Sequence, residues 1–215
     1  MKKNTNIKWH NGKITKEDRW CISGHRSALI WITGLSASGK SSIATELEHT
    51  LFNHNIKTFV LDGDNIRHGL SKDLGFSHDD RRENLRRVGE VAKLLVDAGT
   101  LTIAAFISPY ADQRQTIRDL FDGDKNEFIE VYLKCDISVC ESRDPKGLYK
   151  KARKGEIPFF TGVSDPYEPP EDPEIVIETA KLSVEESVAM IVKYLNEKRL
   201  LLYKAEPSCN QKIRK

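Results

Sequence analysis

The segment from Gly34 to Ser41 reads Gly-Leu-Ser-Ala-Ser-Gly-Lys-Ser and matches the pattern G-x-x-x-x-G-K-[ST] at every fixed position. In this pattern the glycines let the backbone fold around phosphate oxygens, the lysine reaches the β- and γ-phosphates, and the last hydroxyl contacts Mg2+. The apolar run 28–33 precedes the segment, and a helical pattern with apolar residues at three- and four-residue intervals follows it. Strand, loop and helix in this order predict a site for a nucleoside triphosphate. A Gly/Ser-rich turn that merely contains a lysine would leave the flanking elements unexplained.

The rest of the chain predicts one α/β core, for which 215 residues are sufficient. Apolar, β-branched runs alternate with segments long enough for helices, which predicts a five-stranded parallel sheet with helices on both faces, the three-layer fold of P-loop NTPases. The carboxyl ends of the strands should converge on one cleft. The expected strands are 28–33, 57–61, 100–106, 127–133 and 174–177, and the clearest helices are 41–52, 80–98, 111–121 and 184–200.

We divide the chain into an N-terminal arm (1–27), a P-loop domain (28–200) and a basic tail (201–215). Apart from Trp9 and Trp20, the arm lacks a packed pattern. Within the domain, residues 144–173 carry a basic run and six prolines. A segment of this length in a compact domain is usually functional, and we favour a lid that closes over phosphates against a solvated surface excursion.

Composition limits the other classes of function. Lys plus Arg number 34 against 32 Asp plus Glu, so global charge does not suggest a nucleic-acid surface. The four cysteines form no C-x-x-C pair and no zinc-like spacing with histidine, so we expect neither a structural metal nor a disulfide framework. No apolar run approaches a membrane span or a signal core, which leads us to expect a cytoplasmic protein without membrane partners.

Two clusters of polar side chains follow the second expected strand. Asp62-Gly63-Asp64 is placed to hold Mg2+ through water or to take a proton from an attacking hydroxyl, although an Asx-type turn with solvated aspartates is the structural alternative. Further on, Arg81 and Asn84 near a helix start suit a phosphate or sulfate clamp. The alternative there is a solvated helix face with internal ion pairs such as Arg86–Glu90.

Five blocks in order make the chain resemble the adenylylsulfate kinase family. They are GLSASGKSS, LDGDNIRHGL, GFSHDDRRENLRRVGEVAKLL, AFISPYADQR, and DPKGLYKKARKGE with FFTG, and the resemblance runs from about Trp9 to Leu195. It implies transfer of the γ-phosphoryl group of MgATP to the 3′-hydroxyl of adenosine 5′-phosphosulfate. It also implies two small-molecule partners, ATP and adenosine 5′-phosphosulfate, and a homodimeric assembly.

The resemblance implies a role for each donor-side residue. Lys40, Asp62 and Asp64 are the catalytic candidates, and Ser41 with Asp62 is expected at the metal. Lid cations should approach the ATP phosphates, and Arg143 should flank the ATP adenine. The full expected ATP-binding set is Gly34, Leu35, Ser36, Ala37, Ser38, Gly39, Lys40, Ser41, Ser42, Arg143, Lys146, Lys151 and Arg153.

On the acceptor side, the resemblance implies that Phe76 and Phe160 sandwich the adenine, although either phenylalanine could be ordinary core. Stacking of this kind is worth about 1–3 kcal/mol per base. Ser108 is a candidate phosphorylation site, where a dianion would inhibit acceptor binding. The expected acceptor-binding set is Asp64, Arg67, Phe76, Arg81, Asn84, Ile107, Ser108 and Phe160.

The sequence departs from the family pattern at Ala37, where glycine is common. Alanine is tolerable there at negative φ and costly at positive φ. Ser42, where threonine is usual, is a mild change. Two rival functions stay open: another small-molecule P-loop kinase that acts on a nucleoside monophosphate or sugar acid, and a non-catalytic allosteric module that senses the product of the reaction. The intact phosphate loop and lid cations argue against the second.

Overall fold

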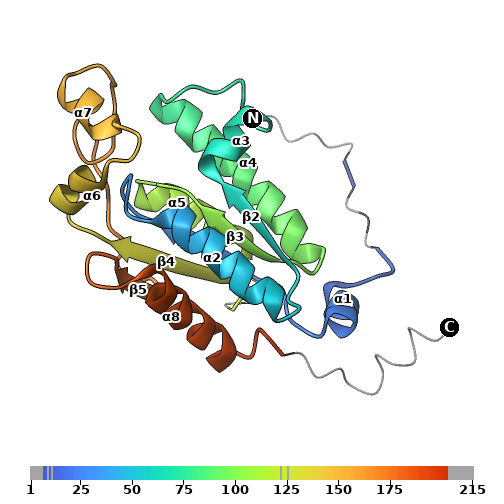
Figure 1. Ribbon diagram of the computed structural model, residues 1–215. Helices are drawn as coiled ribbons and strands as arrows, with labels where there is room; N and C mark the ends of the chain where they lie inside the picture. The colour runs from blue at the N-terminus through green and yellow to red at the C-terminus, as the bar shows by residue number, and fades with distance from the viewer. Residues whose placement is uncertain (1–6, 9, 11, 122, 125, 203–215) are drawn as a thin grey trace.

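The structure is a computed structural model that describes residues 7–8, 10, 12–121, 123–124 and 126–202. Its centre is a five-stranded, all-parallel sheet of order β2-β3-β1-β4-β5 (Figure 1). The predicted three-layer α/β fold of P-loop NTPases is therefore confirmed, and all five strands lie within one residue of the expected starts. The strands are β1 (Leu29–Thr33), β2 (Thr58–Asp62), β3 (Leu101–Ala105), β4 (Phe128–Lys134) and β5 (Ile175–Glu178).

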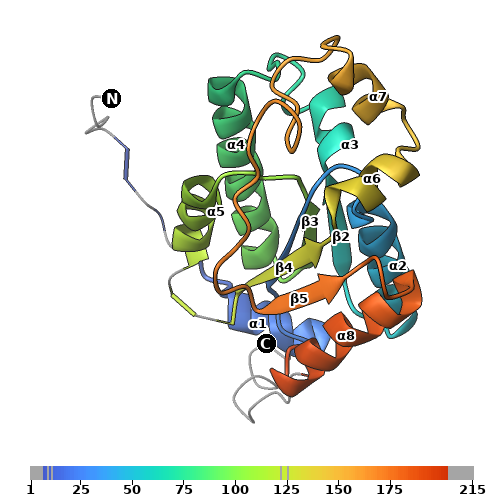
Figure 2. The same cartoon turned by 90° about the vertical axis from the view of Figure 1, so that its left-hand side faces the viewer.

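Helices cover both faces of the sheet because its central strand is buried on both sides. Leu29 and Trp31 pack into one core cluster, whereas Ile30 and Ile32 pack into another. Figure 2 shows helices on both sides of the sheet. The pair α4 (His78–Asp97) and α5 (Ala111–Arg118) covers the Trp31 face, and the pair α2 (Lys40–Asn53) and α8 (Val184–Glu197) covers the other.

The four expected helices are confirmed, and local chemistry explains their ends. The hydroxyl of Ser77 accepts a hydrogen bond from the backbone N–H of Asp80 and caps α4 two residues before the expected start. A capping box of Ser183 and Glu186 starts α8. The expected helix 111–121 ends as α5 followed by the short 3-10 turn η1 (Asp119–Phe121).

The expected arm 1–27 contains a packed helix that sequence reasoning missed, α1 (Lys16–Ser23). A capping box of Thr15 and Asp18 begins the helix, and Gly24, at φ 73°, ends it in the left-handed conformation. Trp20 is 5% exposed and donates a hydrogen bond from Nε1 to Ser27 Oγ at 2.7 Å. Trp9 and most of the tail 201–215 lie outside the described residues.

Three further short helices lie close to the phosphate loop. They are α3 (Gly63–His68), α6 (Ile137–Arg143) and α7 (Leu148–Arg153). Each has six or seven residues, which is too short for an amphipathic period to stand out in the sequence.

The cysteines differ among themselves. Cys135 and Cys140 are buried free thiols, whereas Cys21 is disulfide-bonded. Of the helices in the described part of the chain, none combines the length and apolar character needed to cross a bilayer.

Arg114 on α5 joins three parts of the fold. Its guanidinium donates hydrogen bonds to the carbonyl oxygens of Ser108 and Glu168 at 2.7 and 2.8 Å and contacts the Glu130 carboxylate on β4 at 2.8 Å. The side chains of Arg114 and Glu130 are 4% and 8% exposed. A buried pair of this kind fixes the loop after β3 against the sheet.

We expect Arg114→Met to lower the free energy of unfolding by about 3 kcal/mol, because it leaves the buried Glu130 carboxylate with Arg118 as its remaining partner. Urea unfolding measures the change. Arg82→Met is the matched control: its side chain is 67% exposed, its pair with Asp112 is 3.7 Å long, and the expected change is below about 0.5 kcal/mol. Equal effects of both substitutions would contradict the assignment.

Candidate active site

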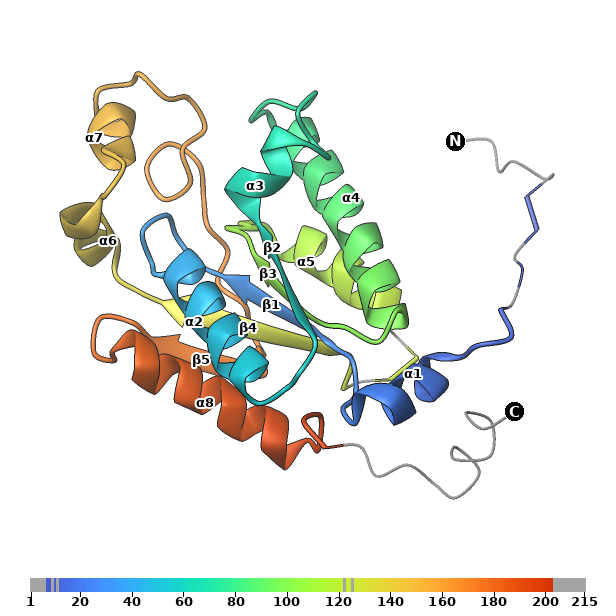
Figure 3. The same cartoon turned by 45° about the vertical axis from the view of Figure 1, so that its right-hand side comes forward.

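The candidate site lies at the carboxyl edge of the sheet. Figure 3 shows the loop between β1 and α2, helix α3 after β2, and helices α6 and α7 after β4 gathered at that edge. Because all strands are parallel, the loop after β3, which carries Ile107 and Ser108, opens at the same edge. The site residues expected on the phosphate loop, on α3, on α6 with α7 and on the loop after β3 therefore lie in one region.

The phosphate loop is built around two glycines in left-handed backbone. Gly34 has φ 153°, and a Cβ there would lie 2.9 Å from the carbonyl oxygen of Leu133. Gly39 has φ 101° and begins α2. The N-terminus of a helix at such a loop presents backbone N–H groups to an anion. The expected phosphate cradle thus has the backbone form that phosphate binding needs.

Lys40 points back onto its own loop. Its Nζ donates hydrogen bonds to the carbonyl oxygens of Gly34 and Leu35 at 3.0 and 2.7 Å. Burial, partly offset by neighbouring charges that include Asp62 and Asp64, lowers the pKa of the Lys40 ammonium to about 8. The ammonium is therefore held near the phosphate cradle, and a bound anion would stabilise its protonated form.

Ala37 lies in the phosphate loop with a strained backbone conformation. Its φ is 59°, in the region that favours glycine. Of the two cases that the sequence left open for this alanine, the structure shows the costly one. Its neighbour Ser36 accepts a hydrogen bond through its carbonyl oxygen from the Tyr149 hydroxyl at 3.0 Å, which ties the loop to α7.

Asp62 serves a turn and the phosphate loop at once. Its Oδ1 accepts the backbone N–H of Asp64 at 2.9 Å and caps α3, as the turn interpretation expected. Its Oδ2 accepts the hydroxyl of Ser41 at 2.8 Å, which brings the two expected metal residues into contact. Asp64 is exposed and forms an ion pair with Lys146 of the lid.

These oxygens fit Mg2+. The cation prefers hydroxyl, carboxylate, water and phosphate oxygens, and it usually takes only one or two carboxylates from the protein. Among the described residues there is no cluster of three or more His, Cys, Asp or Glu side chains able to hold a metal alone. Ser41 and Asp62 therefore suit a metal ion that arrives with the nucleotide.

The acceptor-side residues lie on α3, α4 and the connection between them. Arg67 donates to the carbonyl oxygens of Leu74 and Gly75, and its guanidinium lies 4.3 Å from the ring centre of Phe76. Phe76 is 63% exposed, so its ring is open to a ligand. Asn84 is 4% exposed, and its Oδ1 accepts no hydrogen bond in the described structure.

Arg81 reaches across to the lid. It donates to the carbonyl oxygens of Phe76 and Phe159 and to Thr161 Oγ1, the last at 3.0 Å. The guanidinium therefore links the start of α4 to the strand-like turn at 159–161. Elsewhere on α4 the solvated ion-pair alternative is correct, because Arg86 pairs with both Glu83 and Glu90.

Ser108 is fixed beneath the site. The backbone φ of Ser108 is 41°, and the residue is 3% exposed. Its Oγ accepts the indole N–H of Trp31 and donates to Thr33 Oγ1, both at 3.0 Å. Thr33 in turn donates to the carbonyl oxygen of Ile107 at 2.6 Å. The side chain of Ser108 is therefore part of the core, and a phosphoryl donor reaches it only when this loop opens.

The side chain of Phe160 is buried by packing within the chain. The residue is 9% exposed and meets Tyr149 edge to face, at 5.0 Å between ring centres, in a small core with Cys135, Cys140 and Ala152. Phe159 is the exposed aromatic of the pair, with φ 54°. The role of Phe160 at the acceptor adenine stays a prediction.

The lid cations are held by acceptors of the chain itself. Lys146 pairs with Asp64, and Arg153 pairs with Glu141 at 2.5 Å. Arg143 donates to the carbonyl oxygen of Thr179 at 2.6 Å. Lys151 is exposed. Their approach to ATP phosphates stays a prediction that needs these pairs to exchange.

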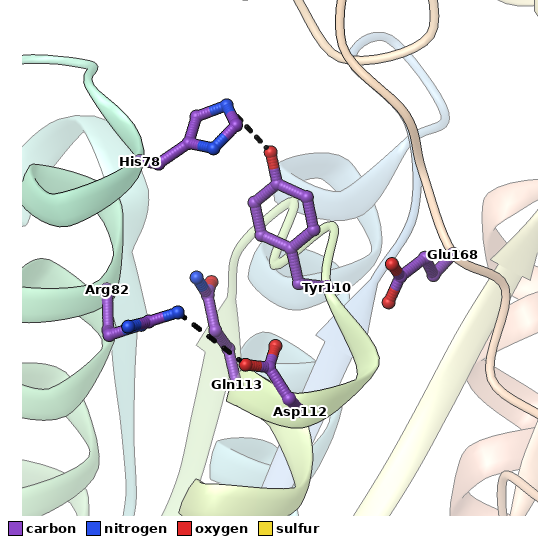
Figure 4. Close-up of a pocket in the computed structure, with 6 residues that line it drawn as sticks. All are labelled: His78, Arg82, Tyr110, Asp112, Gln113 and Glu168. Carbon is purple, nitrogen blue, oxygen red and sulfur yellow. Dashed lines mark hydrogen bonds and ion pairs between the residues drawn. The ribbon is translucent and has the colours of Figure 1, made fainter.

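Sequence reasoning missed one group of polar residues. A pocket of about 300 Å³ lies between α4 and α5, and Figure 4 shows the hydroxyl of Tyr110 directed at the ring of His78 from across it. The two side chains contact each other at 3.1 Å, and both contact Asp165. The pocket is lined by His78, Arg82, Tyr110, Asp112, Gln113 and Glu168.

The phosphate loop lies at the edge of a parallel sheet, its Ser41 contacts the Asp62 carboxylate, and the cation-bearing segment 144–173 lies beside it. These features define a P-loop phosphotransferase. The sequence profile described as adenylylsulphate kinase matches residues 26–178. The chain belongs to the adenylylsulfate kinase family.

Individual relatives agree. The chain is 58% identical to the adenylyl-sulfate kinase of Staphylococcus epidermidis over 197 residues, which is 92% of this chain and 98% of the relative. It is 45% identical, with a TM-score of 0.77, to the APS kinase of Mycobacterium tuberculosis in complex with AMPPNP and APS, covering 80% and 99% of the two chains. A hexameric APS kinase from Thiobacillus denitrificans is 29% identical with a TM-score of 0.63, covering 83% of this chain and 30% of that one.

The strain at Ala37 gives a test. We expect Ala37→Gly to raise the free energy of unfolding by about 1 kcal/mol, because glycine adopts positive φ without the Cβ contact. Chemical denaturation measures the change. The matched control Ala98→Gly, at φ −74°, should lower stability by about 0.5–1 kcal/mol. A loss at both positions would show that Ala37 is not strained.

Proposed function

We propose that the chain performs its family's reaction, transfer of the γ-phosphoryl group of MgATP to the 3′-hydroxyl of adenosine 5′-phosphosulfate, with the residues assigned below. The products are 3′-phosphoadenylylsulfate and ADP, in a step of sulfate activation. The observation that carries the assignment is the position of Asp62, which contacts Ser41 of the phosphate loop and also begins the helix that bears Arg67. One carboxylate thus adjoins the donor and acceptor sides.

On the donor side, the backbone of 34–42 cradles the phosphates and Lys40 leaves the loop carbonyl oxygens for the β- and γ-phosphates. Mg2+ bound with ATP would be held by Ser41 and, directly or through water, by Asp62, and when bound it neutralises phosphate charge. Lys40 adds a fixed positive charge to the group in transfer. Positioning and charge neutralisation are the main catalytic contributions in this class of reaction.

On the acceptor side, Arg67, Arg81 and Asn84 grip the phosphosulfate end, and Phe76 offers its exposed ring to the adenine. The free Oδ1 of Asn84 and the bidentate forks of the two arginines suit a ligand with both hydroxyls and oxyanions. Asp62 and Asp64 orient the 3′-hydroxyl and accept its proton. Direct in-line transfer needs no covalent intermediate on the enzyme.

The lid completes the donor site by exchange of partners. Lys146 leaves Asp64 for a phosphate oxygen, which frees the carboxylate for the acceptor hydroxyl at the same moment. Because the pair is exposed, its loss is a small penalty, of about 0–1 kcal/mol. Closure would also exclude water from the transferred phosphoryl group.

Assembly and location are proposals as well. We propose a homodimer, which the resemblance implies, and a cytoplasmic location, which fits an enzyme that consumes ATP. The side chain of Trp20 packs within its own chain, where it is 5% exposed and donates to Ser27 Oγ, and so it offers little surface to a partner subunit.

The test of the proposed function is ADP release from MgATP with adenosine 5′-phosphosulfate, AMP or gluconate as acceptor, with Lys40→Ala as the blank. We expect turnover with adenosine 5′-phosphosulfate alone and its loss in the variant. Turnover with AMP or gluconate would mean that the acceptor residues are misassigned and would favour the rival small-molecule kinase. ATP binding without turnover on any acceptor would favour the non-catalytic module.

Lys40 predicts a pH dependence of nucleotide binding. With a pKa of about 8 the free amine is mostly neutral at pH 9, and ATP phosphates restore its charge. Binding should then take up about 0.9 proton at pH 9 and about 0.1 at pH 7, and the affinity should fall as pH rises above about 8. Calorimetry of ATP binding in buffers of different ionisation enthalpy counts these protons. Lys40→Arg, which stays charged, should show no uptake at pH 9; equal uptake in both proteins would refute the assignment.

A further inference from the structure

Asp165 is a buried carboxylate near the end of the lid to which sequence reasoning gave no role. Its side chain is 4% exposed. Oδ1 contacts His78 Nε2 at 3.0 Å, and Oδ2 accepts the Tyr110 hydroxyl at 2.7 Å and contacts Arg81 Nη1 at 3.4 Å. Three side chains therefore converge on one charge.

The partners come from different parts of the chain. His78 and Arg81 lie in the first turn of α4, and Tyr110 is the N-cap residue of α5, directly after the loop of Ile107 and Ser108. Figure 4 shows His78 and Tyr110 approaching from these two helices. Asp165 is thus the contact that joins α4, the loop after β3 and the lid.

The backbone around Asp165 is equally fixed. Its N–H donates to the carbonyl oxygen of Phe160 at 3.1 Å, and its own carbonyl oxygen accepts the N–H of Gly162 at 2.7 Å. Ser164 Oγ accepts the N–H of Phe160 at 2.9 Å. Residues 160–165 form a closed turn, so the place of the carboxylate determines the place of Phe160 and Thr161.

Burial of a carboxylate is unfavourable unless charge and hydrogen bonds offset it. Here Arg81 supplies the charge, and two further donors complete the shell. Burial and the hydrogen bond to Asp165 raise the pKa of Tyr110 to about 12, so its hydroxyl remains a donor at neutral pH. An apolar side chain would fill the same space but would leave Arg81 without a charged partner.

We propose that Asp165 is a positioning residue for the acceptor: it orients the Arg81 guanidinium and holds the 160–165 turn in register with α4 and the loop after β3. The proposal rests on the proposed function, because it takes Arg81 as an acceptor-binding residue. It assigns Asp165 no contact with substrate. Its effect should appear in acceptor binding and leave ATP binding unchanged.

The test compares steady-state kinetics of Asp165→Asn with wild type. The amide has the same shape but lacks the charge, so we expect KM for adenosine 5′-phosphosulfate to rise about ten- to a hundredfold, with KM for ATP within about twofold. The matched control Asp172→Asn, at an exposed residue of the same segment, should change neither constant. An unchanged or lowered acceptor KM in Asp165→Asn would overturn the proposal, and a lowered one would mean that the carboxylate competes with substrate for Arg81.

Two further variants separate positioning from a structural role. Tyr110→Phe keeps the carboxylate and removes one donor, and it should raise the same KM by a smaller factor; it also tests the proposal if Asp165→Asn does not fold. In an Arg81→Ala background, Asp165→Asn should add less than about a twofold change in acceptor KM, because the two residues act as a unit. Full additivity would overturn positioning through Arg81. Wild type inactive on this acceptor would instead refute the proposed function.

Discussion

The close approach of Gly34 to strand β4 is the constraint on which the site depends. A Cβ at this residue would meet Leu133 and Ser38 below 3 Å, so the chain can turn from β1 into the phosphate loop only with glycine there. β1 is central in the sheet, and its neighbours are β3 and β4. The loop after β3 and the helices after β4 therefore emerge on opposite flanks of the phosphate loop. The order of strands thus places the loop of Ile107 and Ser108 and the segment 144–173 on either side of the phosphate loop.

The polar and charged side chains of the site pair with other groups of the chain. Lys40 binds loop carbonyl oxygens, Lys146 binds Asp64, and Ser41 binds Asp62. Under the proposed function, substrate binding exchanges these partners, so its free energy is the difference between two states in which the charged groups are paired. Exposed pairs such as Lys146–Asp64 exchange at little cost, whereas the buried contact between Arg114 and Glu130 stays intact and holds the scaffold. Burial therefore distinguishes two kinds of ion pair. Exposed pairs can exchange partners, whereas buried pairs stabilise the fold.

The sequence predicts those features whose causes lie close together along the chain. The five strands and four long helices could be predicted because burial on two faces or one face leaves a period in the sequence. The 8-residue helix α1 was missed because Trp20 is its one buried residue, although Thr15, Asp18 and Gly24 carry the end signals. The burial of Phe160 depends on packing against Cys140 of α6 and against Tyr149 and Ala152 of α7, which belong to separate helices. Asp165 contacts Arg81 across 84 residues, and no local pattern encodes such a pair.

Ser108 belongs both to the core of the fold and to the loop at the candidate site. Its backbone, at φ 41°, lies where the acceptor loop leaves β3, while its hydroxyl joins Trp31 and Thr33 of the central strand. The hydroxyl contacts therefore offset the backbone strain, which is of order 1–3 kcal/mol at such residues. A phosphoryl group there would displace the indole N–H of Trp31 and place a dianion among buried groups. Such a modification would act by opening the loop that carries Ile107, and it would disturb the acceptor site even before it met the substrate's own charge.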